Sequence, residues 1–211
     1  MGAQNFNSKQ RKFYKLRTDK ATKVPAFIEK VKKGDEYVDG DQYTIMTGYL
    51  TKVSVKEVNF PDGKKKEFVV IEMDDDADRN TGIIIETGWN YLVRSILNSL
   101  ATPDAIAHTK ISVYKNKNNG YPAAYIEVNH QKVGWKYNPK ELPEVKKIEF
   151  KGEVISDDTA LNAFFRDEII PYINKKIAGE FEGEAVMSEF PVSGNGKTYE
   201  EPIGLSDDLP F

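Results

Sequence analysis

Residues 45–60 read Ile-Met-Thr-Gly-Tyr-Leu-Thr-Lys-Val-Ser-Val-Lys-Glu-Val-Asn-Phe, and this stretch decides the fold. Residues typical of strands recur at every second position up to Val55, which predicts a half-buried β-strand. The apolar phase then shifts to Val58 and Phe60, and Gly48 lies inside the run. A long strand with an internal glycine and a phase slip is expected to bend through a β-bulge.

The pattern that follows predicts two more strands, a helix, two further strands and an extension. Their ranges are 68–73, 82–87, 89–100, 110–115, 123–129 and 132–137. Three meandering strands, a helix and a closing hairpin match the OB-fold, a five-stranded Greek-key β-barrel that binds oligonucleotides. An SH3-like barrel would lack the helix, and a parallel α/β fold would alternate strands and helices throughout. The predicted class is therefore mainly β with helices, as an OB-fold with its helix between strands three and four.

Charge is divided unevenly along the chain. Residues 1–33 carry ten Lys and Arg against two acids, whereas residues 180–211 carry eight acids against one lysine. A basic head and an acidic tail imply different partners for each. Four parts are predicted: a basic N-terminal arm 1–39, an OB-fold core 40–140, a C-terminal extension with a helix 141–178, and a flexible acidic tail 179–211.

The C-terminal helix is predicted from an apolar stripe between Leu161 and Ile177, which Asp157 or Asp158 can cap. Pro171 lies inside the stripe and should kink or split the helix. We expect this helix to pack against the barrel or against a second copy of the chain, which would make a homo-oligomer.

Basic and aromatic residues together predict an interface for single-stranded nucleic acid, since cations neutralise phosphates while rings stack on bases. The candidates come from the arm, from the two loops that an OB-fold directs at its ligand, and from the extension after the last strand. They are Arg11, Lys12, Phe13, Tyr14, Lys15, Arg17, Lys64, Lys65, Lys66, Lys110, Tyr114, Lys115, Lys117, Tyr121, Lys132, Trp135 and Lys136. For any single aromatic residue, core packing is the alternative.

Signals of catalysis are weak. The acidic loop 74–80 spaces its oxygen-bearing side chains like the start of a calcium loop, but Arg79 and Ile85 stand where glycine and an acid are required. Residues 194–198 resemble the end of a phosphate loop without its preceding strand. The chain has no cysteine, and its two histidines lack metal-ligand spacing. The sequence predicts no enzyme activity, no metal and no cofactor.

Residues 206–211 read Ser-Asp-Asp-Leu-Pro-Phe. This ending resembles the C-terminal tip of bacterial-type single-stranded DNA-binding proteins, in which acids precede an aliphatic residue, proline and phenylalanine. The resemblance implies that the tip recruits replication and repair proteins such as polymerase, primase or helicase. The phenylalanine ring would fill an apolar pocket, and the carboxylates would meet Lys or Arg. The tip residues are Asp207, Asp208, Leu209, Pro210 and Phe211.

The basic head, the additional C-terminal helix and the long tail look more like bacteriophage replication proteins of this type than like the compact bacterial domain. The implied function is to bind and protect single-stranded DNA, with little sequence preference, during replication, recombination and repair. The alternatives are a protein-interaction adaptor, an annealing or recombination factor, and a nuclease. No apolar run approaches a membrane span and no signal peptide is evident, so we expect a cytoplasmic location, in the bacterial host if phage-encoded.

Overall fold

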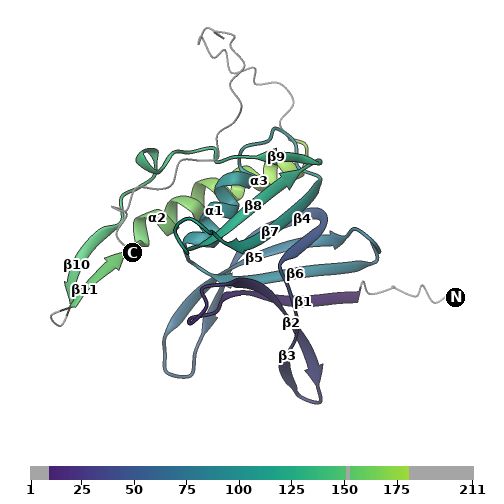
Figure 1. The fold of residues 1–211 in the computed structure, drawn as a ribbon, viewed down its shortest axis with the longest axis horizontal. Helices are drawn as coiled ribbons and strands as arrows, with labels where there is room; N and C mark the ends of the chain where they lie inside the picture. Colours follow the sequence, from purple (N-terminus) through teal and green to yellow (C-terminus); the bar gives the residue numbers. More distant parts are fainter. Residues whose placement is uncertain (1–9, 151–152, 181–211) are drawn as a thin grey trace, which may run out of the picture.

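The computed structural model describes residues 10–150 and 153–180, and it is mainly β with a C-terminal helix (Figure 1). Within these residues one large mixed sheet contains β1 (Gln10–Thr18), β2 (Pro25–Lys33), β3 (Glu36–Tyr43), β4 (Ile45–Asn59), β5 (Lys65–Asp75), β6 (Thr81–Gly88), β7 (His108–Lys115), β8 (Pro122–Val128) and β9 (Gln131–Val133). The remaining elements are α1 (Tyr91–Leu100), η1 (Pro139–Glu141), β10 (Lys146–Phe150), β11 (Glu153–Asp157), α2 (Thr159–Phe164), η2 (Phe165–Ile169) and α3 (Ile170–Ile177). The tail and tip beyond residue 180 lie outside the described residues.

The strand order is β3-β2-β1-β6-β5-β4-β7-β8-β9. Neighbouring strands are antiparallel except β1 and β6, which run parallel from the pair Gln10 and Thr81 to the pair Lys15 and Glu86. The structure therefore places residues 10–39 inside the sheet, where the sequence predicted a basic arm. The reason is that Tyr14, Leu16 and Phe27 alternate with more exposed side chains and are buried in the common core.

Strand β4 bends as the sequence predicted. Its register against β5 shifts between Leu50 and Lys52, a β-bulge or similar irregularity that lies between Gly48 and the expected phase slip, whereas the register is continuous from Val55 to Val58. The bend lets β4 pair with β5 along most of its length and with β7 near its start. Gly48 is required at this crossing, because a Cβ atom there would lie 2.3 Å from the main-chain oxygen of Asp74.

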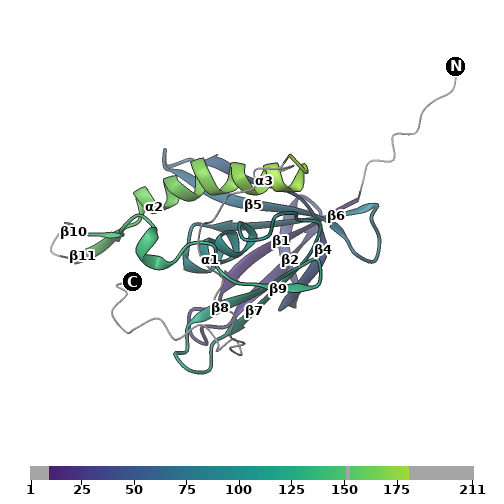
Figure 2. The same cartoon turned by 90° about the horizontal axis from the view of Figure 1, so that it is seen from above.

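The helices lie together beside the upper part of the sheet in Figure 1, and Figure 2 shows α3 running next to β5. The predicted break near Pro171 is confirmed: the C-terminal helix passes from α2 through the π-helical segment η2 into α3. Proline lacks an N–H donor, which disrupts the α-helical hydrogen-bond pattern around it. Asn174 fixes α3 to β4 by accepting from the backbone N–H of Val53 at 2.9 Å and donating to its carbonyl at 2.7 Å. No helix among the described residues is long and apolar enough to cross a membrane.

Candidate nucleic-acid interface

Strand β1 presents different residue types on its two faces. Tyr14 and Leu16 point into the core, where their exposed fractions are 6% and 4%. The side chains at the odd-numbered positions of β1 face outward, since side chains alternate along a strand. We call this outward surface the β1 face; on β1 it consists of Arg11, Phe13, Lys15 and Arg17. The face therefore combines three cations with an aromatic ring.

The register surrounds Phe13 with other side chains suited to contact a base. Phe13 pairs with Ile84 of β6 on one side and with Lys30 of β2 on the other. Its ring is 40% exposed and makes an edge-to-face contact with Tyr37, with centroids 6.4 Å apart. This neighbourhood offers two partly exposed rings beside a cation, which is the combination that stacking on single-stranded nucleic acid uses.

Two acids on this surface each hold two cations. Glu86 lies 3.5 Å from Lys15 and 3.1 Å from Lys56 across the sheet. Exposed ion pairs of this kind contribute little stability and are weakened by salt. A phosphate could therefore replace the carboxylate at either lysine for a small cost.

The second acid, Asp39 of β3, pairs with Lys30 and lies 3.7 Å from Arg17. The hydrogen bond from Lys30 is the main reason that the pKa of Asp39 is lowered. The carboxylate therefore stays charged at neutral pH and holds both cations in position near the end of β1.

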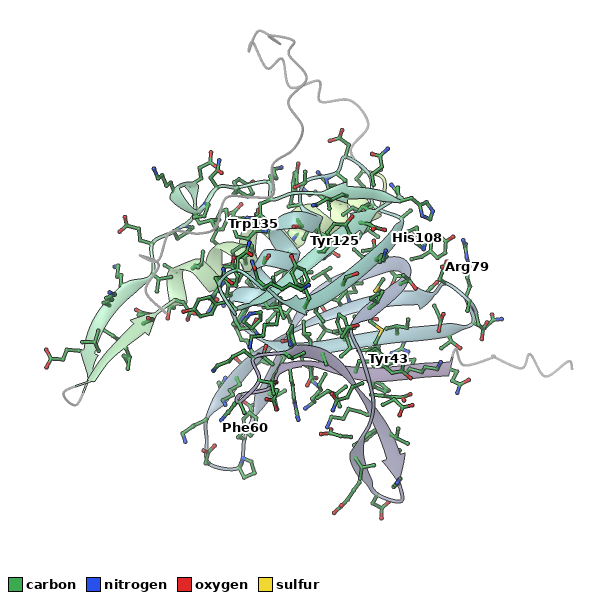
Figure 3. All side chains as sticks on the ribbon, in the orientation of Figure 1. Tyr43, Phe60, Arg79, His108, Tyr125 and Trp135 are labelled. Carbon is green, nitrogen blue, oxygen red and sulfur yellow. The ribbon has the colours of Figure 1, made fainter. Side chains whose placement is uncertain are left out.

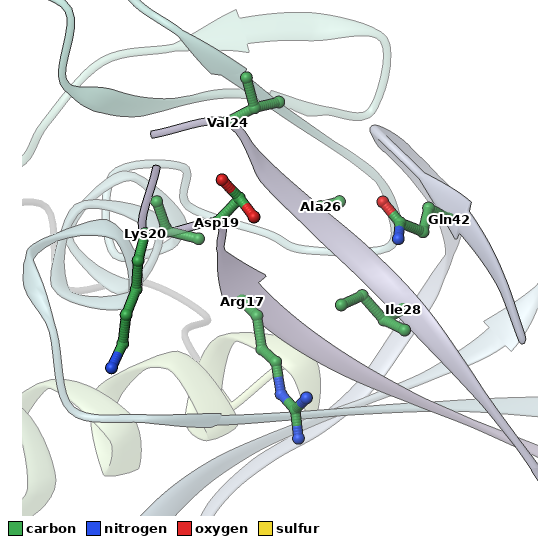
Figure 4. A pocket seen from close by; sticks show the side chains of 8 residues that line it. Arg17, Asp19, Lys20, Val24, Ala26, Ile28 and Gln42 are labelled. Atoms are coloured by element: carbon green, nitrogen blue, oxygen red, sulfur yellow. The ribbon is translucent and has the colours of Figure 1, made fainter. Parts of the chain in front are cut away.

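A surface hollow of about 400 Å³ lies where β1 turns into β2 (Figure 4). We call it the turn hollow; its lining residues are Arg17, Thr18, Asp19, Lys20, Val24, Ala26, Ile28 and Gln42. Figure 4 shows the aliphatic side chains of β2 between the amide of Gln42 and the two cations. Its lining combines aliphatic side chains with two cations. A flat apolar group with an attached anion would fit this lining.

The acid inside the turn hollow is already engaged by the backbone. Asp19 accepts hydrogen bonds from the N–H of Ala21 at 3.0 Å, and from the N–H and hydroxyl of Thr22 at 2.6 and 2.8 Å. The bonds from Thr22 lower the pKa of Asp19. This carboxylate shapes the turn, and Arg17 and Lys20 remain the groups able to meet an anion.

The opposite end of the β1 face is less basic. Arg11 lines a second hollow of about 180 Å³ together with the acids Glu72 and Asp74. Positive charge is therefore concentrated at the Arg17 end, toward the turn hollow.

Two of the predicted arm residues, Lys12 and Tyr14, fall on the other face of β1. Burial raises the pKa of Tyr14 to about 12, and its ring packs against Tyr43 with centroids 5.9 Å apart. Tyr14 is therefore a core residue and its ring cannot stack on a base. Lys12 lies 3.9 Å from Asp75.

The three lysines predicted for the first loop lie at the β4–β5 hairpin and in the start of β5. Lys64 pairs with Asp62 and Lys65 pairs with Glu57, both at 2.9 Å. Lys66 lies over the ring of Phe60, 5.8 Å from its centroid. Each of these cations has a partner on its own hairpin.

The β7–β8 hairpin reaches the turn hollow. Lys115 donates a hydrogen bond of 2.9 Å to the carbonyl of Thr22, in the turn between β1 and β2. Tyr114 and Tyr121 are exposed on the same hairpin, as is Lys117. Lys110 stands further along β7 and pairs with Glu127 at 3.1 Å. The structure therefore brings the second predicted loop next to the Arg17 end of the β1 face.

In the last predicted group Trp135 and Lys136 contact helical residues, and Lys132 contacts strand β8. Trp135 donates from its indole nitrogen to the hydroxyl of Ser95 at 3.0 Å. The ammonium of Lys136 is 3.6 Å from the ring centroid of Tyr172, and that of Lys132 is 5.0 Å from Tyr125. Figure 3 labels Trp135 and Tyr125 in the upper part of the view and Tyr43 lower, among the strands β1–β3. These residues do not join the β1 face.

Several residues of the site were not among the sequence candidates. They are Lys20, Ile28, Lys30, Tyr37, Gln42 and Lys56. The alternation of Ala26, Ile28 and Lys30 indicates a common outward face only if residues 25–33 are recognised as a strand. Their proximity to β1 depends on strand pairing, which a single sequence does not reveal.

Within the described ranges no group of three His, Asp or Glu side chains is placed to hold a metal ion. His108 lies 3.3 Å from Asp76 and stacks on His130 with ring centroids 4.5 Å apart. Comparison with protein-family models, curated proteins and solved structures finds no match for the chain. The function must therefore be inferred from the geometry of the site and the pattern of the sequence.

Proposed function

We propose that the chain binds single-stranded DNA, with little sequence preference, along the β1 face and through the turn hollow. The observation that carries this proposal is the placement of Phe13, Lys15 and Arg17 on one outward face that ends at the turn hollow. Cations spaced along a strand follow a phosphate backbone, and rings and aliphatic walls accept bases of any identity. The proposed role is binding and protection of the strand during replication, recombination and repair, without enzyme activity.

The strand order supports an OB-fold for the central unit. Strands β6, β5, β4 and β7 are neighbours in that order, so the fourth strand along the chain returns beside the first, with α1 in the long connection. This is the order of a Greek key. We propose that this unit is the oligonucleotide-binding barrel, with β1 extending it beside β6.

The tip residues 207–211 lie outside the described residues, so their part in the proposal rests on the sequence. Their resemblance to the tip of bacterial-type single-stranded DNA-binding proteins supports recruitment of replication and repair proteins. The division of charge adds to this support, because an acidic peptide is repelled by DNA and attracted by basic pockets on proteins.

The proposal predicts salt-sensitive binding of single strands by the full chain. Fluorescence polarisation of labelled oligo-dT, measured at several salt concentrations, should show affinity falling as salt rises. Three neutralised phosphates correspond to a slope of log affinity against log salt of about −2. A duplex of the same length should bind more weakly, because its stacked bases are closed to Phe13. Equal or tighter binding of the duplex would contradict the proposal.

The same experiment separates the alternatives. An adaptor whose sheet binds protein would leave oligo-dT unbound at every salt concentration. A nuclease would shorten the labelled strand when a divalent cation is added, and substitution of Asp74, Asp76 and Asp78 would abolish the cleavage. An annealing factor would speed pairing of complementary strands, which a fluorescence quenching assay measures.

Replacing Phe13 with alanine should weaken oligo-dT binding by about tenfold, since stacking of one base on an aromatic ring is worth roughly 1–3 kcal/mol. The salt slope should stay the same, because no cation is lost. Phe13→Tyr keeps the ring and should bind as the parent does. If Phe13→Ala binds with the parent's affinity while remaining folded by circular dichroism, the ring does not contact the strand.

A further inference from the structure

The β10–β11 hairpin stands apart from the large sheet. It forms a separate two-stranded sheet, and Figures 1 and 2 both show it projecting from the body of the molecule. Its aliphatic side chains are exposed: Ile148 by 41%, Ile155 by 40% and Val154 by 71%. An isolated two-stranded hairpin is marginally stable in water, whereas three or more strands with an apolar face are stable. The hairpin therefore has the features of an incomplete sheet.

The outer edge of β10 is complementary to itself. If two copies of β10 run antiparallel and Ile148 faces Ile148 of the other copy, Lys147 stands opposite Glu149 of that copy, and the reverse pair forms as well. Opposite charges in facing positions stabilise a strand pair. Neither Lys147 nor Glu149 has an ion-pair partner among the described residues of its own chain. The two charges are thus available for a second chain.

The aliphatic residues fit the same arrangement. Ile148 is the direct cross-strand partner of Ile155, so both lie on one face of the hairpin. Joining two β10 edges would align four isoleucines in a continuous row across a four-stranded antiparallel sheet. The corresponding pairing of two β11 edges about Ile155 would place Val154 opposite Ser156, which gives no charge complementarity. The β10 edge is therefore the better match for a second copy.

We propose that two copies of the chain associate through their β10 edges, with a twofold axis at Ile148. Such an interface uses the same patch on both subunits, as most dimers do. It is independent of the proposed β1 face, because the interface residues lie on a different sheet. A dimer would carry two β1 faces, so the two could engage one strand together, with a higher effective concentration at the second face.

A charge exchange tests the register on the full chain. Lys147→Glu places two acids opposite two acids, and Glu149→Lys places two lysines opposite two lysines. Each variant alone should raise the dimer dissociation constant by at least about tenfold in sedimentation equilibrium. Mixing the two variants restores opposite charges at all four positions, and so does the double exchange in one chain. Both samples should therefore regain the parent dimer.

Cross-linking gives a second measurement that does not depend on affinity. The chain has no cysteine, so a single introduced thiol is unambiguous. Facing residues in an antiparallel pair have Cα atoms roughly 4.5–5.5 Å apart, within the span of a disulfide. Ile148→Cys should form a covalent dimer under mild oxidation at dilute concentration, whereas the exposed control Val154→Cys should not. A parent chain that stays monomeric, or a dimer unaffected by the charge variants, would overturn the proposal.

Discussion

Replacing Gly48 with alanine is expected to lower the free energy of unfolding by about 3 kcal/mol, near the upper end for an overpacked site. The added Cβ would lie 2.3 Å from the carbonyl oxygen of Asp74 and 3.4 Å from the Cβ of Met73. The nearest obstacle is backbone of the paired strand β5, so a side-chain rotation cannot relieve it. Urea unfolding followed by tryptophan fluorescence measures the loss.

Gly134 supplies the matched control, because a Cβ there would meet no atom within 4 Å. Gly134→Ala should change stability by no more than about 0.5 kcal/mol. If Gly48→Ala were as stable as Gly134→Ala, the tight crossing of β4 and β5 would be incorrect. The crossing would then accept a side chain, and glycine would not be required at position 48.

Reversing two charges at the turn hollow is expected to weaken oligo-dT binding by about 100-fold at low salt. The variant is Arg17→Glu with Lys20→Glu, since both cations line the hollow. The slope of log affinity against log salt should become less negative by roughly 1.4, because two phosphate contacts are lost on a single strand. Polarisation of labelled oligo-dT at several salt concentrations measures both effects.

The control variant reverses two exposed lysines elsewhere, Lys140→Glu with Lys175→Glu, and so makes the same change in net charge. At about 0.1 M salt it should bind oligo-dT within a few-fold of the parent, because screening then limits the reach of exposed charges to about 10 Å. Equal losses in both variants would show that net charge alone governs binding. In that case the turn hollow would not be part of the interface.

Much of the central fold could be predicted from local pattern. Alternating residues in β4, the apolar runs of β5 and β6, and the helical spacing of α1 each carry their own signal within a few residues. The break before Pro171 was also predictable, because a proline acts on the local backbone. A bulge in β4 was expected as well, but the register shifts at Leu50–Lys52 and not at the change of apolar phase after Val55.

The N-terminal strands could not be recognised in the same way. Strand β1 carries cations at several outward positions, and this charge pattern suggests a solvated arm. Only two of its side chains, Tyr14 and Leu16, are buried, which is too weak an apolar pattern to indicate a strand. Its parallel partner β6 is far away in the sequence, and parallel pairing leaves no turn signal between the partners. No short stretch of the sequence therefore contains a signal for the position of β1 in the sheet.

The candidate site was predicted in part for the same reason. The sequence predicts Phe13, Lys15 and Arg17 by residue type, whereas only the alternation of a strand over residues 10–18 separates them from the buried Tyr14. Lys30 and Gln42 reach the site only through the pairing of β2 and β3. Trp135 lies apart from the β1 face: its basic neighbours suggest an interface, and its indole is hydrogen-bonded to Ser95 of α1.

The parallel pairing of β1 with β6 also bears on synthesis by the ribosome. Gln10 pairs with Thr81, so β1, β2 and β3 emerge and can form a meander well before β6 exists. Until then the free edge of β1 is open to strands of other nascent chains, a known route to aggregation. Cations on such an edge repel a second copy of the same strand. Lys15 and Arg17 would therefore protect the growing chain before they ever meet a ligand.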